Sequence, residues 1–194
     1  MIKKKFKAIE LNRLDEATIQ NIRSWRNQEF VRRNMFCQDI IAEEEHNQWV
    51  QRVKADDNKN VFVFYLDDVP FGVHVYTYDT ENQWVEIGSY LVAEEYQAMG
   101  YGVILSYFGQ DIMYNVLGYD TMYGEILEYN KNASSVSRFL GGEKELRKEP
   151  VHLNGKTYNV NIVRGTRQEW NSFEKEKLGK LVMKFVYEEY EVIK

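Results

Sequence analysis

The sequence is poor in cysteine, in basic charge and in long apolar runs, and each shortage excludes a class of protein. Cys37 is the single cysteine among the 194 residues, so the chain can form no internal disulfide and no multi-cysteine metal site. The net charge of -5 argues against a general nucleic-acid binder, which needs a basic surface to neutralise phosphates. No apolar run reaches the length of a membrane span or the core of a signal peptide. We therefore expect a cytoplasmic protein with neither a membrane nor a nucleic acid as its partner.

Several motifs of known enzyme chemistry are also missing. The His, Cys, Asp and Glu residues are nowhere grouped at the spacing of metal ligands, so no metal is expected. There is no Gly-x-Ser-x-Gly pattern and no P-loop pattern. What is present is ordinary for a globular chain, with 44% hydrophobic and 28% charged residues, and its length suits one domain.

The periodicity of the chain predicts a mixed α/β fold with one central sheet. Apolar residues at helical spacing predict helices, and β-branched and aromatic runs between turn residues predict strands. The expected order is a strand at 6–11, helices over 14–25 and from 43 to 53, strands at 60–66, 71–78 and 84–92, a helix over 103–116, a strand at 121–127, a helix over 131–140, and strands at 144–153 and 156–164. The last two flank Asn154-Gly155, which is typical of a two-residue hairpin turn of the primed type.

The tail is predicted to be one long amphipathic helix. Its apolar residues recur at helical spacing from Trp170 to Tyr190, with a mild interruption at Gly179. We therefore divide the chain into a domain over residues 1–165 and a C-terminal helix over 166–194. That helix packs on the domain or against a second copy of the chain, in a homodimer.

A glycine turn between a strand and a helix is the most informative stretch. It reads Gln97-Ala98-Met99-Gly100-Tyr101-Gly102. Two glycines let the backbone approach a ligand closely, and the following helix directs its free N–H groups and positive dipole end to the same place. The stretch therefore predicts an anion site, most plausibly for a pyrophosphate, although a turn without a ligand is the alternative.

This loop resembles the pyrophosphate loop of the GNAT superfamily of acetyl-coenzyme A dependent N-acetyltransferases. A second segment, from Asn130 through Ala133 to Gly141, is similar to the family's segment of asparagine, short helix and Gly-Phe, with Gly142 in place of the phenylalanine. The resemblance implies the GNAT fold, in which a mostly antiparallel mixed sheet is flanked by helices, here with an extra C-terminal helix. It also implies acetyl-coenzyme A as co-substrate.

The N-terminal half resembles a narrower group. Ser24-Trp-Arg-Asn27, Val31-Arg-Arg-Asn-Met35 and Glu43-Glu-Glu-His46 are similar to segments of bacterial sugar-nucleotide N-acetyltransferases, above all those that act on UDP-4-amino-4,6-dideoxy-N-acetyl-altrosamine in pseudaminic acid synthesis. Acetyltransferases of ribosomal-protein N-termini share a similar start and the same loop. The resemblance thus implies an acceptor that is a nucleotide-linked amino sugar. A protein N-terminus or a polyamine is the rival acceptor.

The resemblance also assigns roles to residues. Cofactor contacts are expected from the main chain near Leu91 and Val92, from Gln97, Ala98, Met99, Gly100, Tyr101 and Gly102, and from Asn130, whose alternative role is that of a turn former. Acceptor contacts are expected from Arg26, His46, Thr77 and Tyr90. The alternatives for Arg26 and His46 are a helix-end pairing and a satisfied core histidine.

The chemistry needs a base for the acceptor amine and a proton for the leaving thiolate. Glu86, on the strand before the loop, is the first candidate for the base, and His74 is the second. The alternatives are a solvent-facing carboxylate for Glu86 and a packed strand residue for His74. Counting from Asn130 puts Ser137 where the family has its tyrosine acid. Because serine is a weaker acid, a catalytically silent acyl-coenzyme A binding module is the second hypothesis.

Overall fold

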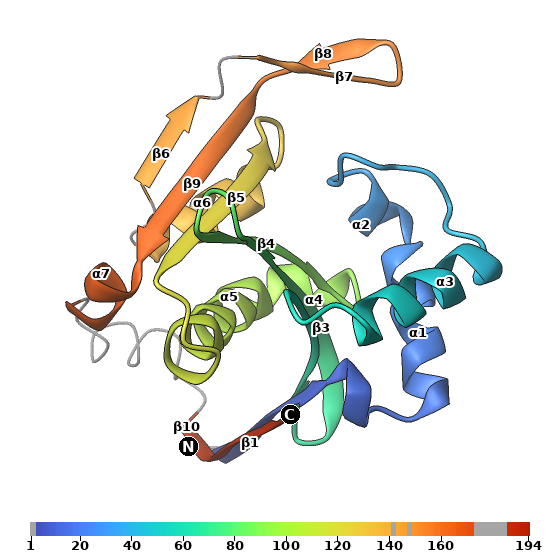
Figure 1. Cartoon of the computed structure of the whole chain (residues 1–194), viewed down its shortest axis with the longest axis vertical. Helices are drawn as coiled ribbons and strands as arrows, with labels where there is room; N and C mark the ends of the chain where they lie inside the picture. The colour runs from blue at the N-terminus through green and yellow to red at the C-terminus, as the bar shows by residue number, and fades with distance from the viewer. Residues whose placement is uncertain (1–2, 141–142, 147–148, 173–185) are drawn as a thin grey trace.

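The fold is a single large sheet with helices on both faces, seen in a computed structural model that describes residues 3–140, 143–146, 149–172 and 186–194 (Figure 1). Within these residues the sheet has eight strands in the order β10-β1-β2-β3-β4-β5-β9-β6. The strands are β1 (Lys3–Glu10), β2 (Lys59–Leu66), β3 (Val69–Asp79), β4 (Trp84–Leu91), β5 (Thr121–Leu127), β6 (Glu143–Leu146), β9 (Val160–Thr166) and β10 (Val186–Ile193). A separate hairpin consists of β7 (Val151–Leu153) and β8 (Lys156–Tyr158).

The pairing is mostly antiparallel, as predicted. Strands β1 to β4 form an antiparallel meander, and β9 pairs antiparallel with both β5 and β6. Parallel pairing occurs between β4 and β5 and between β1 and β10. The predicted fold class, a mostly antiparallel mixed sheet flanked by helices, is confirmed.

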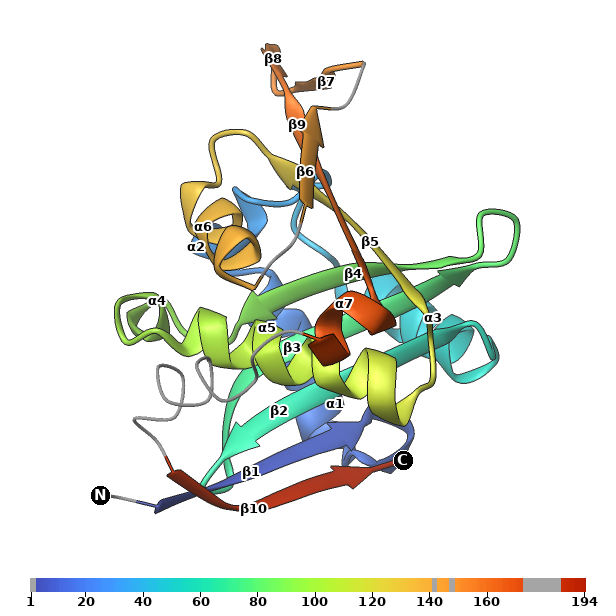
Figure 2. The ribbon, with the colours of Figure 1, turned by 90° about the vertical axis from the view of Figure 1, so that its left-hand side faces the viewer.

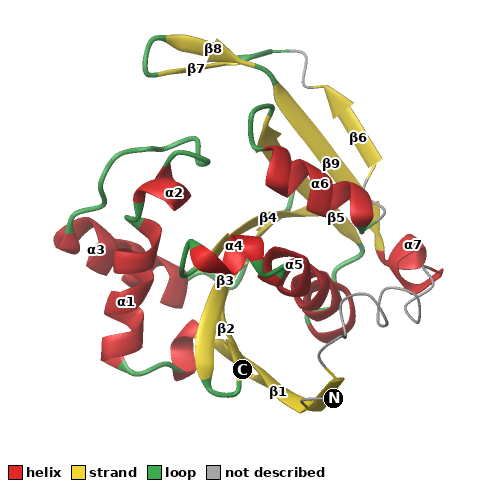
Figure 3. Ribbon diagram, turned by 180° about the vertical axis from the view of Figure 1, so that it is seen from behind, coloured by secondary structure: helices red, strands yellow, loops and turns green. Residues whose placement is uncertain are grey.

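Helices cover the two faces of the sheet in separate groups. Helices α1 (Glu16–Arg26), α2 (Glu29–Arg32) and α3 (Glu43–Lys54) lie on one side, and α5 (Tyr101–Asp111), α6 (Lys131–Phe139) and α7 (Arg167–Ser172) lie on the other (Figure 3). Figure 2 shows α5 running across the sheet, with α1 and α3 behind it. Two buried clusters result. One lies beneath α5, and the smaller one joins Ile19, Ile22, Val50 and Val53 of α1 and α3 to β2 and β3.

Residues close together in the sequence determine where several of the helices and turns begin or end. Asp15 caps α1 by accepting a hydrogen bond from the Thr18 N–H at 2.7 Å. Asn154 and Gly155 have φ values of 49° and 74°, which is the pair of positive angles that a type I′ turn requires, so the predicted hairpin turn is confirmed. The strands around it are shorter than predicted, because β6 pairs with β9 while β7 and β8 pair only with each other.

The predicted C-terminal helix over 166–194 is wrong for its last part. Only Arg167–Ser172 is helical, and Val186–Ile193 forms strand β10, paired in parallel with β1; the residues between them lie outside the described part. The reason is tertiary. Strand β1 would otherwise be an open sheet edge, and the Tyr190 ring lies 5.2 Å from that of Phe6 and 5.4 Å from that of Phe108. These contacts favour a strand, with side chains alternating between two faces, over a helix for Val186–Ile193.

Candidate active site

The central feature of the site is a gap between β4 and β5. The two strands pair only at Val85–Met122 and Glu86–Tyr123, although β4 continues to Leu91 and remains paired with β3 along that length. Figure 2 shows β5 turning away from β4 beyond this point. The last residues of β4 therefore present their main chain to an open edge, where an extended ligand can add hydrogen bonds as another strand would.

The register identifies which main-chain groups face the gap. The Val92 N–H donates to the Phe71 carbonyl at 3.1 Å, and the Val92 carbonyl accepts from Gln28 Nε2 at 2.8 Å. Because Leu91 opposes Gly72 in the pair before that bond, the N–H and carbonyl of Leu91 point away from β3 and into the gap. The prediction for Leu91 agrees with this geometry. The prediction for the main chain of Val92 does not, because both of its polar groups already have partners.

The glycine loop leads into α5 at the open end of the gap. Gln97 and Ala98 close the short helix α4 (Glu95–Ala98), a turn that the sequence did not predict. Gly100 is the N-cap of α5 at φ 78°, in the left-handed region where glycine is unstrained. It carries no side chain to cap the first turn, and a helix N-terminus of this kind can bind an anion.

The other residues of the loop differ in exposure. Met99 is exposed, whereas Tyr101 is buried and stacks on Tyr96 with ring centroids 4.7 Å apart. A Cβ at Gly102 would lie 3.9 Å from Val136 of α6, so the loop faces α6. Tyr101 thus anchors the start of α5 in the core, and the loop itself stays accessible.

A cavity of about 310 Å³ brings two predicted cofactor residues together. Gln97 of the glycine loop and Asn130 after β5 both line it, although 33 positions separate them in the sequence. The remaining lining residues are Arg33, Asn34, Tyr129, Lys131 and Asn132. Two of these are cations, which suits the phosphate groups of a nucleotide carrier. Arg33 and Lys131 were not predicted as site residues: both lie in segments that carry the family resemblance, but only the fold shows that their side chains reach the glycine loop.

Helix α6 explains the second predicted segment. Asn130 is its N-cap, and its Oδ1 accepts from the Ala133 N–H at 3.1 Å. The capping role considered for Asn130 is therefore present, together with its place in the cavity wall. Ser137 lies two turns further on, and its hydroxyl oxygen is buried without a hydrogen-bond partner among the described residues. A buried hydroxyl in this state is free to donate to a bound ligand.

Glu86 is exposed on the face of the sheet that carries α1 and α3. It pairs with Thr77 of β3, and Tyr90, four residues along, pairs with Val73, which packs in the α1–α3 cluster. Thr77, Glu86 and Tyr90 therefore share one face. Within the described residues, the exposed Glu86 carboxylate forms no hydrogen bond and no ion pair.

His74 lies on the opposite face of the sheet. It is 1% exposed, its Nε2–H donates to the Leu105 carbonyl of α5 at 3.1 Å, and its ring fills the space that a Cβ at Gly109 would need. Burial lowers the pKa of His74 to about 4. The structure thus separates the two candidate bases, and the placement of His74 matches the packed strand residue considered as its alternative.

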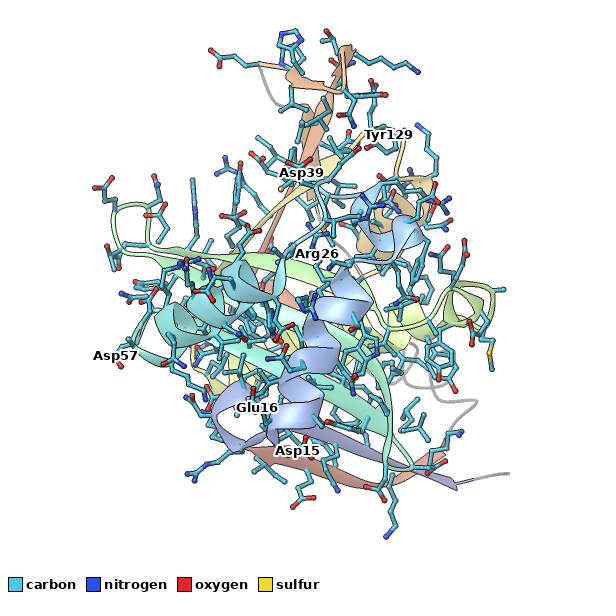
Figure 4. The ribbon with its side chains drawn as sticks, turned by 90° about the vertical axis from the view of Figure 1, so that its right-hand side faces the viewer. Asp15, Glu16, Arg26, Asp39, Asp57 and Tyr129 are labelled. Carbon is cyan, nitrogen blue, oxygen red and sulfur yellow. The ribbon has the colours of Figure 1, made fainter. Side chains whose placement is uncertain are left out.

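Arg26 lies at the end of α1, close to Tyr90. Its Nη2 donates to the Cys37 carbonyl at 2.8 Å, whereas its Nη1 is buried without a hydrogen-bond partner in the described part of the chain. Burial lowers the pKa of Arg26, and burial of the Tyr90 hydroxyl, which donates to the Ile22 carbonyl at 3.4 Å, raises the pKa of Tyr90. Figure 4 shows Arg26 on this side of the molecule, below Asp39 and Tyr129. An unpaired guanidinium nitrogen here is suited to an anion.

His46 is not part of this surface. It is 3% exposed, its Nε2–H donates to the Ile19 carbonyl at 2.9 Å, and its ring lies 5.6 Å from that of Trp49. Burial lowers the pKa of His46. The hydrogen bond joins α3 to α1, as expected for the satisfied core histidine that was the alternative.

Metal sites and membrane-spanning helices are both lacking among the described residues. No group of His, Cys, Asp and Glu side chains there could hold a metal ion. No helix among the described residues is long and apolar enough to span a membrane.

A parted strand pair, a helix N-cap without a side chain and a neighbouring cavity together form a candidate site for an extended, anionic ligand. The sequence pattern described as "Acetyltransferase (GNAT) family" matches residues 19–141, which is more than half of the chain. The chain belongs to this family, and the predicted activity, an acetyl-coenzyme A dependent N-acetyltransferase, is confirmed at that level. No curated protein sequence matches the chain.

Three kinds of acetyltransferase are represented among the solved structures that are similar to this chain. The spermidine N-acetyltransferase from Vibrio cholerae, solved with CoA and spermine, has 16% identity and a TM-score of 0.75, with 87% of this chain and 98% of that chain covered. RimL, a ribosomal L7/L12 alpha-N-protein acetyltransferase, has 16% identity and a TM-score of 0.66, with 86% and 95% covered. Campylobacter jejuni N-acetyltransferase PseH, solved with acetyl coenzyme A, has 18% identity and a TM-score of 0.58, with 83% and 98% covered. At these identities the likeness shows the fold and leaves the acceptor open.

Proposed function

We propose that this protein transfers an acetyl group from acetyl-coenzyme A to the amino group of a nucleotide-linked amino sugar by direct attack, without a covalent enzyme intermediate. The observation that carries the proposal is the placement of a free carboxylate and a partly unpaired guanidinium on one face of the sheet beside the gap. Glu86 can receive the proton of the acceptor amine, and Arg26 can bind the diphosphate.

The spacing of these groups suits an acceptor with an amine at one end and an anion at the other. Glu86 and Tyr90 lie four positions apart on β4, which is about 13 Å at the rise of an extended strand. Arg26 stands next to Tyr90, and burial of both groups means that a phosphate bound there would be shielded from water. A hexose and its diphosphate fill a span of this order.

Each remaining group has a task in direct transfer. The Leu91 N–H, directed into the gap, is placed to stabilise the thioester oxygen as negative charge develops on it. Gly100 and the first turn of α5 hold the diphosphate of coenzyme A, and Gln97 and Asn130 border its path. Glu86 takes the ammonium proton, so the amine attacks in its neutral form. The Ser137 hydroxyl is the candidate in α6 for protonating the leaving thiolate, because it stands at the family's tyrosine position.

The test measures thiol release from acetyl-coenzyme A with UDP-4-amino-4,6-dideoxy-N-acetyl-altrosamine, spermidine and a ribosomal-protein N-terminal peptide as separate acceptors. We expect the UDP-sugar to have the highest kcat/KM. A higher kcat/KM for spermidine or the peptide would refute the sugar assignment. Binding of coenzyme A with background thiol release for every acceptor would favour the silent binding module.

The role of Glu86 is tested with Glu86→Gln. We expect kcat to fall by about 100-fold or more, which is the usual contribution of a general base, while the KM for acetyl-coenzyme A stays unchanged. Glu81→Gln is the matched control, because Glu81 is an exposed carboxylate in the turn before β4. If Glu86→Gln retains wild-type kcat, Glu86 is not the base.

A further inference from the structure

Two aromatic rings beside Glu86 have no role in the steps above. Trp84 of β4 and Tyr123 of β5 stack with ring centroids 4.6 Å apart and an interplanar angle of 11°. We infer that this stacked pair, the aromatic platform, is the surface on which the sugar ring of the acceptor packs. The inference rests on the proposed function, because it assigns a subsite for the same acceptor.

The platform lies on the face of the sheet that carries Glu86, at the end of the gap where β4 and β5 are still paired. Tyr123 is paired with Glu86 across the two strands, and Trp84 precedes Glu86 by two residues, so all three side chains point to the same side. Two residues of extended strand place Trp84 about 6.6 Å from Glu86 along β4. A ring that packs on the platform therefore has its amino group within reach of the carboxylate.

The space next to the platform is open. Gly88 is the next residue of β4 on this face; it is exposed, and a Cβ built on it would have no heavy atom within 4 Å. The absence of a side chain there leaves a floor between Glu86 and Tyr90. The diphosphate of an acceptor whose sugar ring packs on the platform can cross this floor toward Arg26.

The rings are held in place before any ligand binds. The Arg164 guanidinium carbon lies 5.4 Å from the centroid of the Trp84 ring and 5.8 Å from that of Tyr123. The Tyr123 hydroxyl donates to Glu125 Oε1 at 2.6 Å. Both rings remain partly exposed. Little side-chain entropy is lost when a ligand packs on rings that are already fixed in this way.

The chemistry of the platform suits a pyranose ring. The negative face of an aromatic ring attracts the positively polarised C–H groups of a pyranose ring and of a deoxy-sugar methyl group.

The experiment compares Trp84→Ala, Trp84→Phe and the control Tyr78→Ala in the full-length protein, with UDP-4-amino-4,6-dideoxy-N-acetyl-altrosamine as acceptor. Tyr78 is a matched control because it also stacks on another ring, that of Tyr119 at 5.2 Å, and lies at the same end of the sheet but on the opposite face. We expect Trp84→Ala to raise the acceptor KM by about tenfold, the loss of one aromatic contact with its buried area. Trp84→Phe should stay within about threefold of the wild type.

Two further readouts separate this inference from the proposed function. The KM for acetyl-coenzyme A should be unchanged in all three variants, and Tyr78→Ala should leave the acceptor KM unchanged. If the wild-type protein acetylates the UDP-sugar but Trp84→Ala has a normal acceptor KM, the platform is refuted and the proposed function stands. If the wild-type protein does not use the UDP-sugar, the proposed function itself fails.

Discussion

His74 offers the sharpest quantitative test, because burial affects both its pKa and its suitability as a catalytic base. The carbonyl of Leu105 can only accept, so Nε2 carries the proton and Nδ1 is buried without a partner among the described residues. Protonation of Nδ1 would place an unpaired charge between α5 and β3. That cost is why burial lowers the pKa of His74 from 6.5 to about 4.

The sign and size of the effect on stability follow from this pKa. The unfolded chain binds a proton at this histidine below pH 6.5, whereas the folded chain does so only near pH 4. The stability that the protein gains while this histidine is neutral in both states is therefore fully present above pH 6.5, and it is lost as the pH falls toward 4. At about 1.36 kcal/mol for each pH unit, the loss amounts to about 3 kcal/mol of the free energy of unfolding.

The variant His74→Gln keeps an N–H for the Leu105 carbonyl and removes the titration. At pH 8 we expect it to be less stable than the wild type by about 1–2 kcal/mol, since the ring contacts with Phe64 and Tyr76 are lost. As the pH falls to 4 this difference should shrink by about 3 kcal/mol and change sign. Urea unfolding at several pH values measures it, and titrations common to both proteins cancel in the difference.

Two outcomes of this experiment would refute the reasoning. A stability difference that stays constant between pH 8 and pH 4 would mean that burial does not hold His74 neutral. A fall in kcat of about 100-fold in His74→Gln at pH 8 would mean that this histidine, rather than Glu86, is the base. We expect kcat to stay within a few-fold of the wild type, because the ring lies on the α5 face, away from the acceptor side of the gap.

Three further predictions address other parts of the molecule. Gly100→Ala should lower the affinity for coenzyme A and destabilise the protein by about 1–2 kcal/mol, because alanine is strained at φ 78° although a Cβ there meets no atom within 4 Å. Calorimetric titration measures the affinity and urea unfolding measures the stability. Wild-type affinity would argue against the loop as the diphosphate site. Arg26→Lys should raise the KM for the UDP-sugar by about tenfold without changing that for acetyl-coenzyme A, since lysine lacks the guanidinium fork; an unchanged acceptor KM would remove Arg26 from the site. Tyr190→Ala should destabilise the fold by about 1 kcal/mol through the lost contacts with Phe6 and Phe108, and thermal unfolding no different from that of Glu191→Ala would contradict the docking of β10 described above.

Local chemistry accounts for what the sequence predicted correctly. The meander from β2 to β4, the turn at Asn154-Gly155 and the glycine turn before α5 all depend on residues close together in the chain. Positive φ at Gly100 and Gly155 is favoured by glycine itself, and the alternation of Val61 and Val63 with larger rings is readable without any partner. The cofactor loop could therefore be located from the sequence alone.

Contacts between distant segments decided the rest. The period of the tail is compatible with a helix, and only the open edge of β1 and the rings of Phe6 and Phe108 make Val186–Ile193 a strand. His74 and Glu86 are both strand residues with titratable side chains, but the register of β3 and β4 places them on opposite faces. A one-residue difference in position along a strand reverses the direction of a side chain, so the sequence could name both candidates while the packing of α5 on one face determined which of them is exposed.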